Sequence, residues 1–577
     1  MHEEELEKSL LRHRKYFASG CTYPVKNRMK ALKSLRASIE RHEEDVYAAL
    51  QADLGKSREE SYMCELGLVY SEISYMLKHV RKLSREHTVW TPLSQFHSRS
   101  FTKPVPRGVV LIMSPWNYPL MLALDPLVDA IAAGNCAVVK PSAYAPETTK
   151  VLKAIMEDAF PSDYVSLVTG GREENQELLK LPFDYIFFTG SQKVGKVVLR
   201  EASENLVPVS LELGGKSPCI VDETANLKLA ARRIVFGKFL NSGQTCVAPD
   251  YLVVHESVKE ELIGLIKNEI IRQFGENPLQ NEKYGKIINQ HHHERLSSLV
   301  SRSRILYGGN TDSRTLKIEP TIVGPVNWQS EIMEDEIFGP ILPVMSYLNL
   351  DAVLEEMNSR PHPLAFYIFS ESRRNISKLK DGCHFGGGCI HDCIIHLATS
   401  EMGFGGVGAS GMGSYHGKVG FETFSHRKSM VDKKTRCDVV CVHQVKLKFF
   451  AADRAFMALL FIGSKCIPAV KCSDRELLFF ACQQIFIDAG LLCNIFVTHQ
   501  PLDFFFKFCG VKVRAFSVFI EKQAPGQALH FFSLFRKDGL YPIDHRTEIV
   551  PENNRTGVVL VLSHVCLDGL VLSTGCP

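Results

Sequence analysis

Three residues of chemically useful types stand beside turn-forming residues in this chain. Cys246 lies in NSGQTCVAPDY, among small and polar residues that favour a partly exposed turn, where a thiolate is reactive. Glu212 comes before two glycines in LELGGKSP, and Asn117 lies between two prolines in SPWNYP, directly after an apolar run. Taken one at a time, each has a simpler interpretation: a buried structural cysteine, a solvated glutamate and an asparagine that stabilises a turn.

The elements that must position these residues can be predicted from apolar periodicity. Over the first hundred residues the spacing is helical, most clearly from Met29 to Leu54, and Gly55 is a predicted helix end. Short apolar runs then predict buried strands at 109–113, 136–140, 165–170 and 185–190. Helical patterns lie between them at 119–133, 146–159 and 172–180, and a second series of strands and helices runs from about 217 to 395. This alternation predicts two α/β units, each with a mostly parallel sheet covered by helices on both faces.

Composition and charge are typical of a soluble globular protein. Of the 577 residues, 45% are hydrophobic and 23% are charged, and 67 Lys and Arg against 64 Asp and Glu leave a net charge of +3. Because positive and negative side chains are nearly equal in number, we predict no nucleic-acid partner and no polybasic membrane patch. The acidic start MHEEELEKSLL is unlike a secretory signal or a transit peptide, and cysteines without a repeating spacing indicate free thiols. We therefore expect a cytoplasmic protein.

A change of composition near residues 437–441 marks the start of a different tail. Nine of the 17 cysteines lie from Cys437 onward, and 17 of the 34 phenylalanines fall in the last 137 residues. The tail has no sustained helical or strand period, so we favour a sequence altered by splicing or by translation of a non-coding region. A membrane anchor at 557–577 is less favoured, because His564 and Asp568 would be costly in a bilayer. An unknown interaction segment is the third alternative.

Five motifs occur together in an order and spacing that resembles the aldehyde dehydrogenase superfamily: FTGSQKVG, LELGGKSP, GQTCVAPDY, EIFGP and FGGVGASGMGSYHG. VAPDY after the cysteine, and YHG followed by FETFSH, resemble the class 3 branch, and the resemblance covers about residues 1–436. It implies two doubly wound α/β domains, a Rossmann-like cofactor domain and a catalytic domain, with a small β oligomerisation arm. The expected bounds are 1–211 for the NAD(P)-binding domain with part of the arm near 85–105, 212–400 for the catalytic domain, 401–436 for a Gly-rich loop and the remaining arm, and 437–577 for the unassigned tail.

The resemblance also gives the three reactive residues their roles. Cys246 matches the family nucleophile, which attacks the aldehyde carbonyl to form a thiohemiacetal and, after hydride transfer, a thioester. Asn117 matches the side-chain donor to the oxyanion, with the Cys246 backbone N–H as the second donor. Glu212 matches the general base that activates water or removes the thiol proton. The implied reaction is NAD(P)-dependent oxidation of medium- or long-chain aliphatic or aromatic aldehydes to carboxylic acids. The alternative is a catalytically silent member with a structural or binding role.

A cofactor site for NAD or NADP is implied in the same way. Backbone N–H groups at the start of a helix should face a pyrophosphate. The residues of that turn are Gly190, Ser191, Gln192, Lys193, Val194 and Gly195. Lys140 resembles the family residue near the adenosine ribose, Glu336 the carboxylate on the nicotinamide ribose, and Phe338 the residue beside that ring. The resemblance implies a small-molecule aldehyde substrate, a homodimer and no metal.

Three residues depart from the family pattern. Gly403 stands where proline is usual and His391 where asparagine is common, and in the family both positions lie near the substrate or subunit-contact region. Ala143 follows KPS where glutamate is usual. A carboxylate there would hold the ribose hydroxyls and repel the 2′-phosphate of NADP. Its absence predicts that NADP is used at least comparably to NAD.

Three further patterns are expected to carry no chemistry. Two overlapping GxGxxG matches, at 403–408 and 406–411, lack the strand and the amphipathic helix of a dinucleotide fingerprint. Four residues that could be proposed as a zinc site fit no common spacing. They are Cys383, Cys389, Cys393 and His396. His291–His293 are expected to begin a solvent-facing helix.

Overall fold

The computed structural model describes residues 3–435 except 93–94 and 96–97, and beyond them only the backbone of four short strands. The chain divides into two compact units, Met1–Val440 and Cys441–Pro577. In the second unit β19 (Val518–Ile520) pairs with β20 (Phe531–Ser533), and β21 (Cys566–Leu567) pairs with β22 (Leu570–Val571), both antiparallel. Apart from that last pair, the candidate anchor at 557–577 lies outside the described residues. No helix among the described residues combines the length and apolar character that a membrane span requires.

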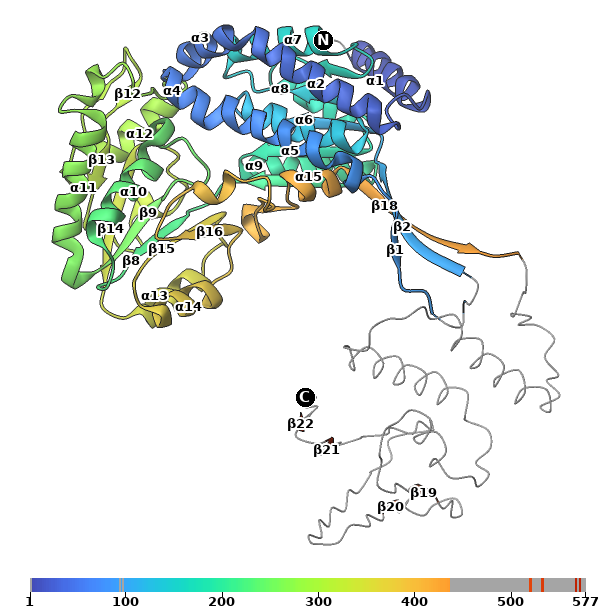
Figure 1. Cartoon of the computed structure of the whole chain (residues 1–577). Helices are drawn as coiled ribbons and strands as arrows, with labels where there is room; N and C mark the ends of the chain where they lie inside the picture. The colour runs from blue at the N-terminus through green and yellow to red at the C-terminus, as the bar shows by residue number, and fades with distance from the viewer. Residues whose placement is uncertain are drawn as a thin grey trace. The chain divides into compact units, whose positions relative to one another are not determined.

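A layer of helices from the first 83 residues covers one side of the first unit (Figure 1). It contains α1 (Glu3–Ala18), α2 (Val25–Arg41), α3 (Glu43–Leu54), α4 (Arg58–Ser61), the π-helical turn η1 (Tyr62–Leu66) and α5 (Gly67–Leu83). The helical spacing predicted from Met29 to Leu54 is confirmed, since Leu32, Leu35 and Ile39 are fully buried on one face of α2. Gly55 ends α3 with φ 68°, a left-handed conformation that glycine adopts at no steric cost.

The first sheet has the strand order β17-β7-β6-β3-β4-β5, and all pairs are parallel except β17 with β7. Its strands are β3 (Val109–Met113), β4 (Cys136–Lys140), β5 (Val165–Leu167), β6 (Tyr185–Gly190), β7 (Val209–Leu213) and β17 (Gly411–Met412). Its helices are α6 (Met121–Ala133), α7 (Pro146–Ala159), α8 (Arg172–Lys180) and α9 (Gln192–Glu204). The predicted elements are confirmed, although β5 ends three residues before the predicted 170. β3 and β4 are buried on both faces, which explains their uninterrupted apolar runs.

The second sheet has the strand order β10-β13-β14-β9-β8-β15-β16 and is parallel except for β10. Its strands are β8 (Pro218–Val221), β9 (Tyr251–His255), β10 (Ile305–Tyr307), β13 (Thr321–Val323), β14 (Ile341–Tyr347), β15 (Ala365–Phe369) and β16 (Gly387–Ile390). The helices of this part are α10 (Leu227–Phe239), α11 (Lys259–Phe274), α12 (Gln290–Ser301), α13 (Leu350–Asn358) and α14 (Arg373–Gly382). A small hairpin, β11 (Thr311–Asp312) with β12 (Lys317–Ile318), lies between β10 and β13 in the chain.

Two connections place the reactive residues between the sheets. The chain passes from the first sheet to the second between Leu213 and Pro218, so Glu212 lies at the end of the last parallel strand. The chain returns through β17, where Gly411 pairs with Glu212, and then through α15 (Gly417–Thr423). A three-stranded sheet of β1 (His87–Val89), β2 (Ser98–Pro106) and β18 (Ser425–Lys433) extends from the body of the first unit (Figure 1).

Candidate active site

Cys246 lies in a turn between the short helix η3 (Leu240–Gly243) and β9, which confirms the predicted turn. Its side chain is half-buried. Burial raises the pKa of the thiol to about 12, and the carboxyls of Glu336 and Glu212 add to the shift, while backbone N–H groups of Cys246 and Val247 oppose it. The ligand-free thiol is therefore protonated at neutral pH. The reactive thiolate expected from the sequence needs a base to form.

The cysteine loop, residues 241–247, is strained at its start and fixed by one side chain. Asn241 and Ser242 have φ values of 52° and 51°, in the left-handed region that non-glycine residues rarely adopt. The Gln244 amide donates to the carbonyls of Asn241 and Lys286, each at 3.0 Å, and its Oε1 accepts from the Ile288 N–H, also at 3.0 Å. Strain of this kind persists only where surrounding contacts hold it, and it is concentrated at functional sites.

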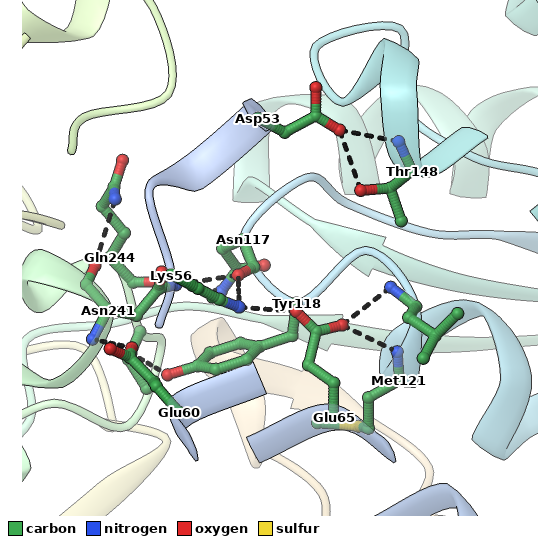
Figure 2. Close-up of polar contacts among 12 residues, drawn as sticks. Asp53, Lys56, Glu60, Glu65, Asn117, Tyr118, Met121, Thr148, Asn241 and Gln244 are labelled. Carbon is green, nitrogen blue, oxygen red and sulfur yellow. Dashed lines mark hydrogen bonds and ion pairs between the residues drawn. The ribbon is translucent and has the colours of Figure 1, made fainter. Parts of the chain in front are cut away.

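Asn117 is buried in the loop between β3 and α6 and contacts the cysteine loop directly. Its Nδ2 donates to the Gln244 carbonyl at 3.0 Å, two residues before Cys246 (Figure 2). An amide nitrogen carries two hydrogens, so the second is left for another acceptor. The backbone carbonyl of Asn117 accepts from Lys56 Nζ at 2.9 Å and from Asn241 Nδ2 at 2.8 Å. Both ends of this residue are therefore fixed.

Glu212 lies in β7, where it pairs with Thr189 of β6 and Gly411 of β17. Its side chain is buried, and neither carboxyl oxygen has a hydrogen-bond partner among the described residues. Burial raises the pKa of this carboxyl well above its ordinary value. A buried carboxyl without partners is costly for stability, and groups perturbed in this way are concentrated where proton transfer takes place.

Glu336 and Phe338 lie in the segment that leads into β14. Burial raises the pKa of Glu336 to about 8, and a backbone hydrogen bond from Gly215 opposes the shift. The Glu336 carboxyl also explains why residue 214 is a glycine, because a Cβ at that position would lie 2.1 Å from Glu336 Oε2. Phe338 has φ 49° and packs edge-on against Trp116, with the ring centres 5.3 Å apart. Another strained residue thus borders the site.

The start of α9 opens on a cleft of about 730 Å³, within the size range of ligand pockets. Ser191 caps the helix by accepting from the Val194 N–H at 3.4 Å. A Cβ at Gly195 would lie 2.8 Å from Leu213 Cδ2, so glycine is what lets the helix approach β7. N–H groups of the first helical turn, together with the cations of a cleft that also contains Glu334, Asp335 and Glu336, fit a pyrophosphate. The cations that line the cleft are Lys193, Lys196, Arg200, Lys216 and Arg360.

Lys140 is placed apart from this cleft. It ends β4 and is buried, and its ammonium donates to the carbonyls of Pro141 at 2.9 Å and Gly170 at 2.7 Å. Burial lowers its pKa to about 8. Ala143, in the loop that follows, is exposed. The structure therefore groups Asn117, Glu212 and Glu336 around Cys246, and it places the buried Lys140 and the exposed Ala143 away from the cleft.

Within the described residues, the four candidate zinc ligands do not come together as one cluster, and the GxGxxG matches lie in a loop. Cys389 Sγ lies 3.5 Å from His396 Nδ1, whereas Cys383 lines the cleft. No group of three or more His, Cys, Asp or Glu within the described part of the chain could hold a metal ion. The GxGxxG matches lie in a loop that leads through a short 3₁₀ turn into β17, without a preceding strand and following helix of their own. His391 has φ 61°, a conformation that asparagine and histidine tolerate better than most residues.

The prediction of a solvent-facing start for α12 is wrong for one of its three histidines. His291 is exposed, and His292 is half-buried with its ring 5.1 Å from that of Trp116. His293 is buried, because it shares a face of α12 with Leu296 and Val300. That spacing of three and four residues is visible in the sequence, so periodicity alone would have predicted the burial.

Reasoning from sequence missed the buried residues that support Asn117. These are Lys56 and Glu65, whose side chains are 2.6 Å apart and fully buried, and Gln244. Only Gln244 stands in a recognised motif. Nothing in the predicted helical region distinguishes Lys56 or Glu65 from charged residues on a solvated face.

Comparisons with known proteins agree with this geometry. The aldehyde dehydrogenase family model matches residues 2–430. The chain is 46% identical over 435 residues to 4,4'-diaponeurosporen-aldehyde dehydrogenase of Staphylococcus aureus, covering 75% of this chain and 95% of that protein. It is 42% identical over 419 residues to the aldehyde dehydrogenase, dimeric NADP-preferring, of Canis lupus familiaris, covering 72% and 92%. The solved substrate-bound state of Staphylococcus aureus AldH matches with a TM-score of 0.76 at 44% identity, covering 78% of this chain and 99% of that one. The chain therefore belongs to the aldehyde dehydrogenase family and is an enzyme that oxidises aldehydes.

Proposed function

We propose that this enzyme oxidises medium- or long-chain aliphatic or aromatic aldehydes to carboxylic acids with NAD or NADP, through a covalent intermediate on Cys246. The observation that carries the proposal is the grouping of one amide donor and two buried carboxyls around a half-buried thiol. The apolar surroundings that raise the pKa of Glu212 make its carboxylate a stronger base once it is ionised.

In the proposed reaction, Cys246 forms and breaks the bond to the substrate, and Glu212 transfers the protons. The ionised form of Glu212 takes the thiol proton, and the Cys246 sulfur forms a bond to the carbonyl carbon. The carbonyl oxygen gains the negative charge and accepts from the second Asn117 amide hydrogen and the Cys246 N–H. Loss of the aldehyde hydrogen as hydride leaves a thioester. After passing its first proton to solvent, Glu212 deprotonates a water, and the hydroxide bonds to the thioester carbonyl carbon. The carbon–sulfur bond then breaks, the acid is released, and the proton held by Glu212 returns to the Cys246 thiolate to regenerate the thiol.

The cofactor would be held by residues at the cleft and by Lys140, which lies apart from it. The turn from Gly190 to Gly195 would bind the pyrophosphate, Glu336 the nicotinamide ribose and Lys140 the region of the adenosine ribose, with Phe338 beside the nicotinamide ring. When bound, the nicotinamide supplies the acceptor for the hydride. The cations that line the cleft and the first turn of α9 support this assignment. The canine relative is named NADP-preferring, and the exposed Ala143 is compatible with use of either cofactor.

We propose a homodimer joined through the three-stranded sheet. β18 is an edge strand in the order β1-β2-β18, and its side chains after Ser425 are exposed. Unpaired strand edges favour pairing with a second chain, and apolar exposed residues lie here: Val89, Trp90, Met430 and Val431. The canine relative is named dimeric.

All cysteines of residues 3–435 are free, which supports the proposed cytoplasmic location.

Formation of reduced cofactor by the purified full chain tests the proposed function. We expect absorbance of NADH or NADPH to appear with aliphatic aldehydes of increasing chain length and with benzaldehyde, and equal amounts of carboxylic acid to accumulate. Without aldehyde, no reduced cofactor should form. Absence of product from every aldehyde with both cofactors, in protein that still binds them, would instead establish a catalytically silent family member.

A further inference from the structure

A fully buried ion pair supports the loop of Asn117 from the helical layer. Lys56 Nζ lies 2.6 Å from Glu65 Oε1, and both side chains have no exposed surface (Figure 2). The same ammonium donates to the Asn117 carbonyl at 2.9 Å and lies 4.2 Å from the centre of the Tyr118 ring. Two of its three hydrogens are thus accounted for by Glu65 and Asn117, and its charge faces an aromatic ring.

The second oxygen of Glu65 fixes the chain just beyond Asn117. Glu65 Oε2 accepts from the backbone N–H groups of Leu120 at 2.8 Å and Met121 at 3.1 Å, where α6 begins (Figure 2). These N–H groups have no partner inside the helix. The pair therefore holds the loop at two points, the carbonyl of residue 117 and the start of α6. The side chain of Asn117 leaves the backbone at the Cα directly before the first of these points.

The other end of this support is the cysteine loop itself. Asn241 Nδ2 donates to the same Asn117 carbonyl at 2.8 Å, and the Asn117 side chain donates to the Gln244 carbonyl at 3.0 Å. The hydrogen bonds form a continuous path from Glu65 through Lys56 and Asn117 to the residue two positions before Cys246. A shift of the Lys56 ammonium would move the amide donor relative to the thiol.

Two features indicate that this pair has a role beyond stability. Buried ion pairs often stabilise a fold no better than apolar residues of similar volume, so retention of two charges calls for another reason. Glu65 also lies in the π-helical turn η1, an arrangement that is rare and often found at functional sites.

We propose that Lys56 and Glu65 are positioning residues that set the place of the Asn117 amide donor relative to Cys246. The inference rests on the proposed function, because it assumes that Asn117 donates to the oxyanion. The pair itself does not contact substrate; it acts through the Asn117 peptide and the start of α6.

The test replaces both charges together, as Lys56→Met with Glu65→Gln, in the full chain. This removes the donor to Asn117 together with the carboxylate that pairs with it, and the amide oxygen introduced by Glu65→Gln can still accept from Leu120 and Met121. We expect kcat for aldehyde oxidation to fall about 10- to 100-fold, because small displacements of a positioned group have effects of this size. The KM for the cofactor should change less than about threefold. If the first variant does not fold, Lys56→Leu with Glu65→Gln, which also removes the donor to Asn117, provides the same measurement.

Arg28→Met is the matched control. Arg28 is a buried cation of the same helical layer that donates to the carbonyls of Thr22, Tyr23 and Ala132, away from Asn117. It should lower the melting temperature and leave kcat within about twofold of wild type. A loss of kcat equal to that of the Lys56–Glu65 variant would overturn the proposal, because it would reflect general destabilisation.

The Asn117→Ala background decides whether the pair acts through Asn117. If it does, the double replacement lowers kcat no further once the amide is absent. Equal losses in both backgrounds would overturn the inference while leaving aldehyde oxidation established by the wild type. A crystal structure of the double variant gives a readout independent of activity. The Asn117 amide should move away from the Gln244 carbonyl, and an unchanged contact would overturn the proposal even if wild type oxidised no aldehyde.

Discussion

Glu65 and Glu212 are both buried beside the site, but they differ in every contact. Glu65 has three partners, the Lys56 ammonium and two backbone N–H groups at the start of α6. Glu212 has none among the described residues, and burial raises its pKa well above the ordinary value. A carboxylate whose hydrogen bonds are all used can hold a structure, whereas one without partners is free to exchange a proton. The difference separates the side of the site that we propose to position Asn117 from the side that we propose to react.

Cys246→Ser removes the group on which both sides are proposed to act, so it has the largest expected effect. A serine hydroxyl is almost wholly protonated near neutral pH and is a poor nucleophile without its own activating base. We expect kcat to fall by more than about 10³-fold while NAD(P) binding stays nearly intact. Steady-state kinetics and cofactor fluorescence titration measure the two quantities. The exposed Cys21 provides the control, since Cys21→Ser should keep full activity. Retention of most of the wild-type rate by Cys246→Ser would remove Cys246 from its role.

Glu212→Gln tests the reacting side alone. It keeps the size of the side chain but removes the base, so the steady-state rate should fall by about 10²- to 10⁴-fold. If deacylation becomes the slow step, a burst of NAD(P)H equal to the enzyme concentration should precede the slow phase, with acyl-enzyme trapped on Cys246. Stopped-flow absorbance and mass spectrometry detect the two signals. A rate unchanged between pH 6 and 8 would show that another group activates the water.

The pH dependence of stability gives a smaller effect with a definite sign. Glu212 is protonated in the folded protein over a range where the unfolded chain, with an ordinary pKa near 4.5, is ionised. Unfolding then releases a proton, so this group lowers the free energy of unfolding as pH rises from about 4.5 towards its folded pKa, by up to about 1.4 kcal/mol per pH unit. The Glu212→Gln variant should lack this contribution, so it should gain stability relative to wild type as pH rises.

Urea unfolding at pH 5, 6, 7 and 8 measures this difference. Glu260→Gln is a control on the surface of α11, where the side chain is largely exposed, and its unfolding curves should follow wild type at each pH. If the curves of Glu212→Gln and wild type stay parallel across the whole range, Glu212 is ionised in the folded protein and the contrast with Glu65 fails.

The reacting side was predictable from sequence because its signals are local. Cys246 and Glu212 stand in short motifs, and the strands that carry the loops are buried on both faces and read as continuous apolar runs. The turn from Gly190 into α9 also follows from adjacent residues. Local patterns were therefore enough for the sheets and for the reactive groups.

The positioning side was not predictable, because its partners are distant in the chain. Lys56 meets Asn117 across 61 residues, and Glu65 meets Leu120 across 55. Charged residues are almost never fully buried unless paired, so no pattern in a helical segment indicates such a pair. Lys140 shows the same limit, since its bond to Gly170 connects the end of β4 to a loop 30 residues later in the chain.

The smallest expected effect is at the exposed edge, where a new carboxylate at Ala143 would face solvent. In the wild type we expect NADP to be used at least comparably to NAD. Ala143→Glu should shift the ratio of kcat/KM towards NAD, because the added charge repels the 2′-phosphate. At this exposed position the repulsion between the carboxylate and the 2′-phosphate is about 1 kcal/mol, which corresponds to about a fivefold change in the ratio of kcat/KM. Glu147 is a poor substitute for the missing group, since its carboxylate pairs with Lys150 at 2.6 Å. Ala143→Gln, of matched size and without charge, should leave the ratio unchanged. A wild type that prefers NAD a hundredfold, with no change in Ala143→Glu, would show that residue 143 does not face the phosphate.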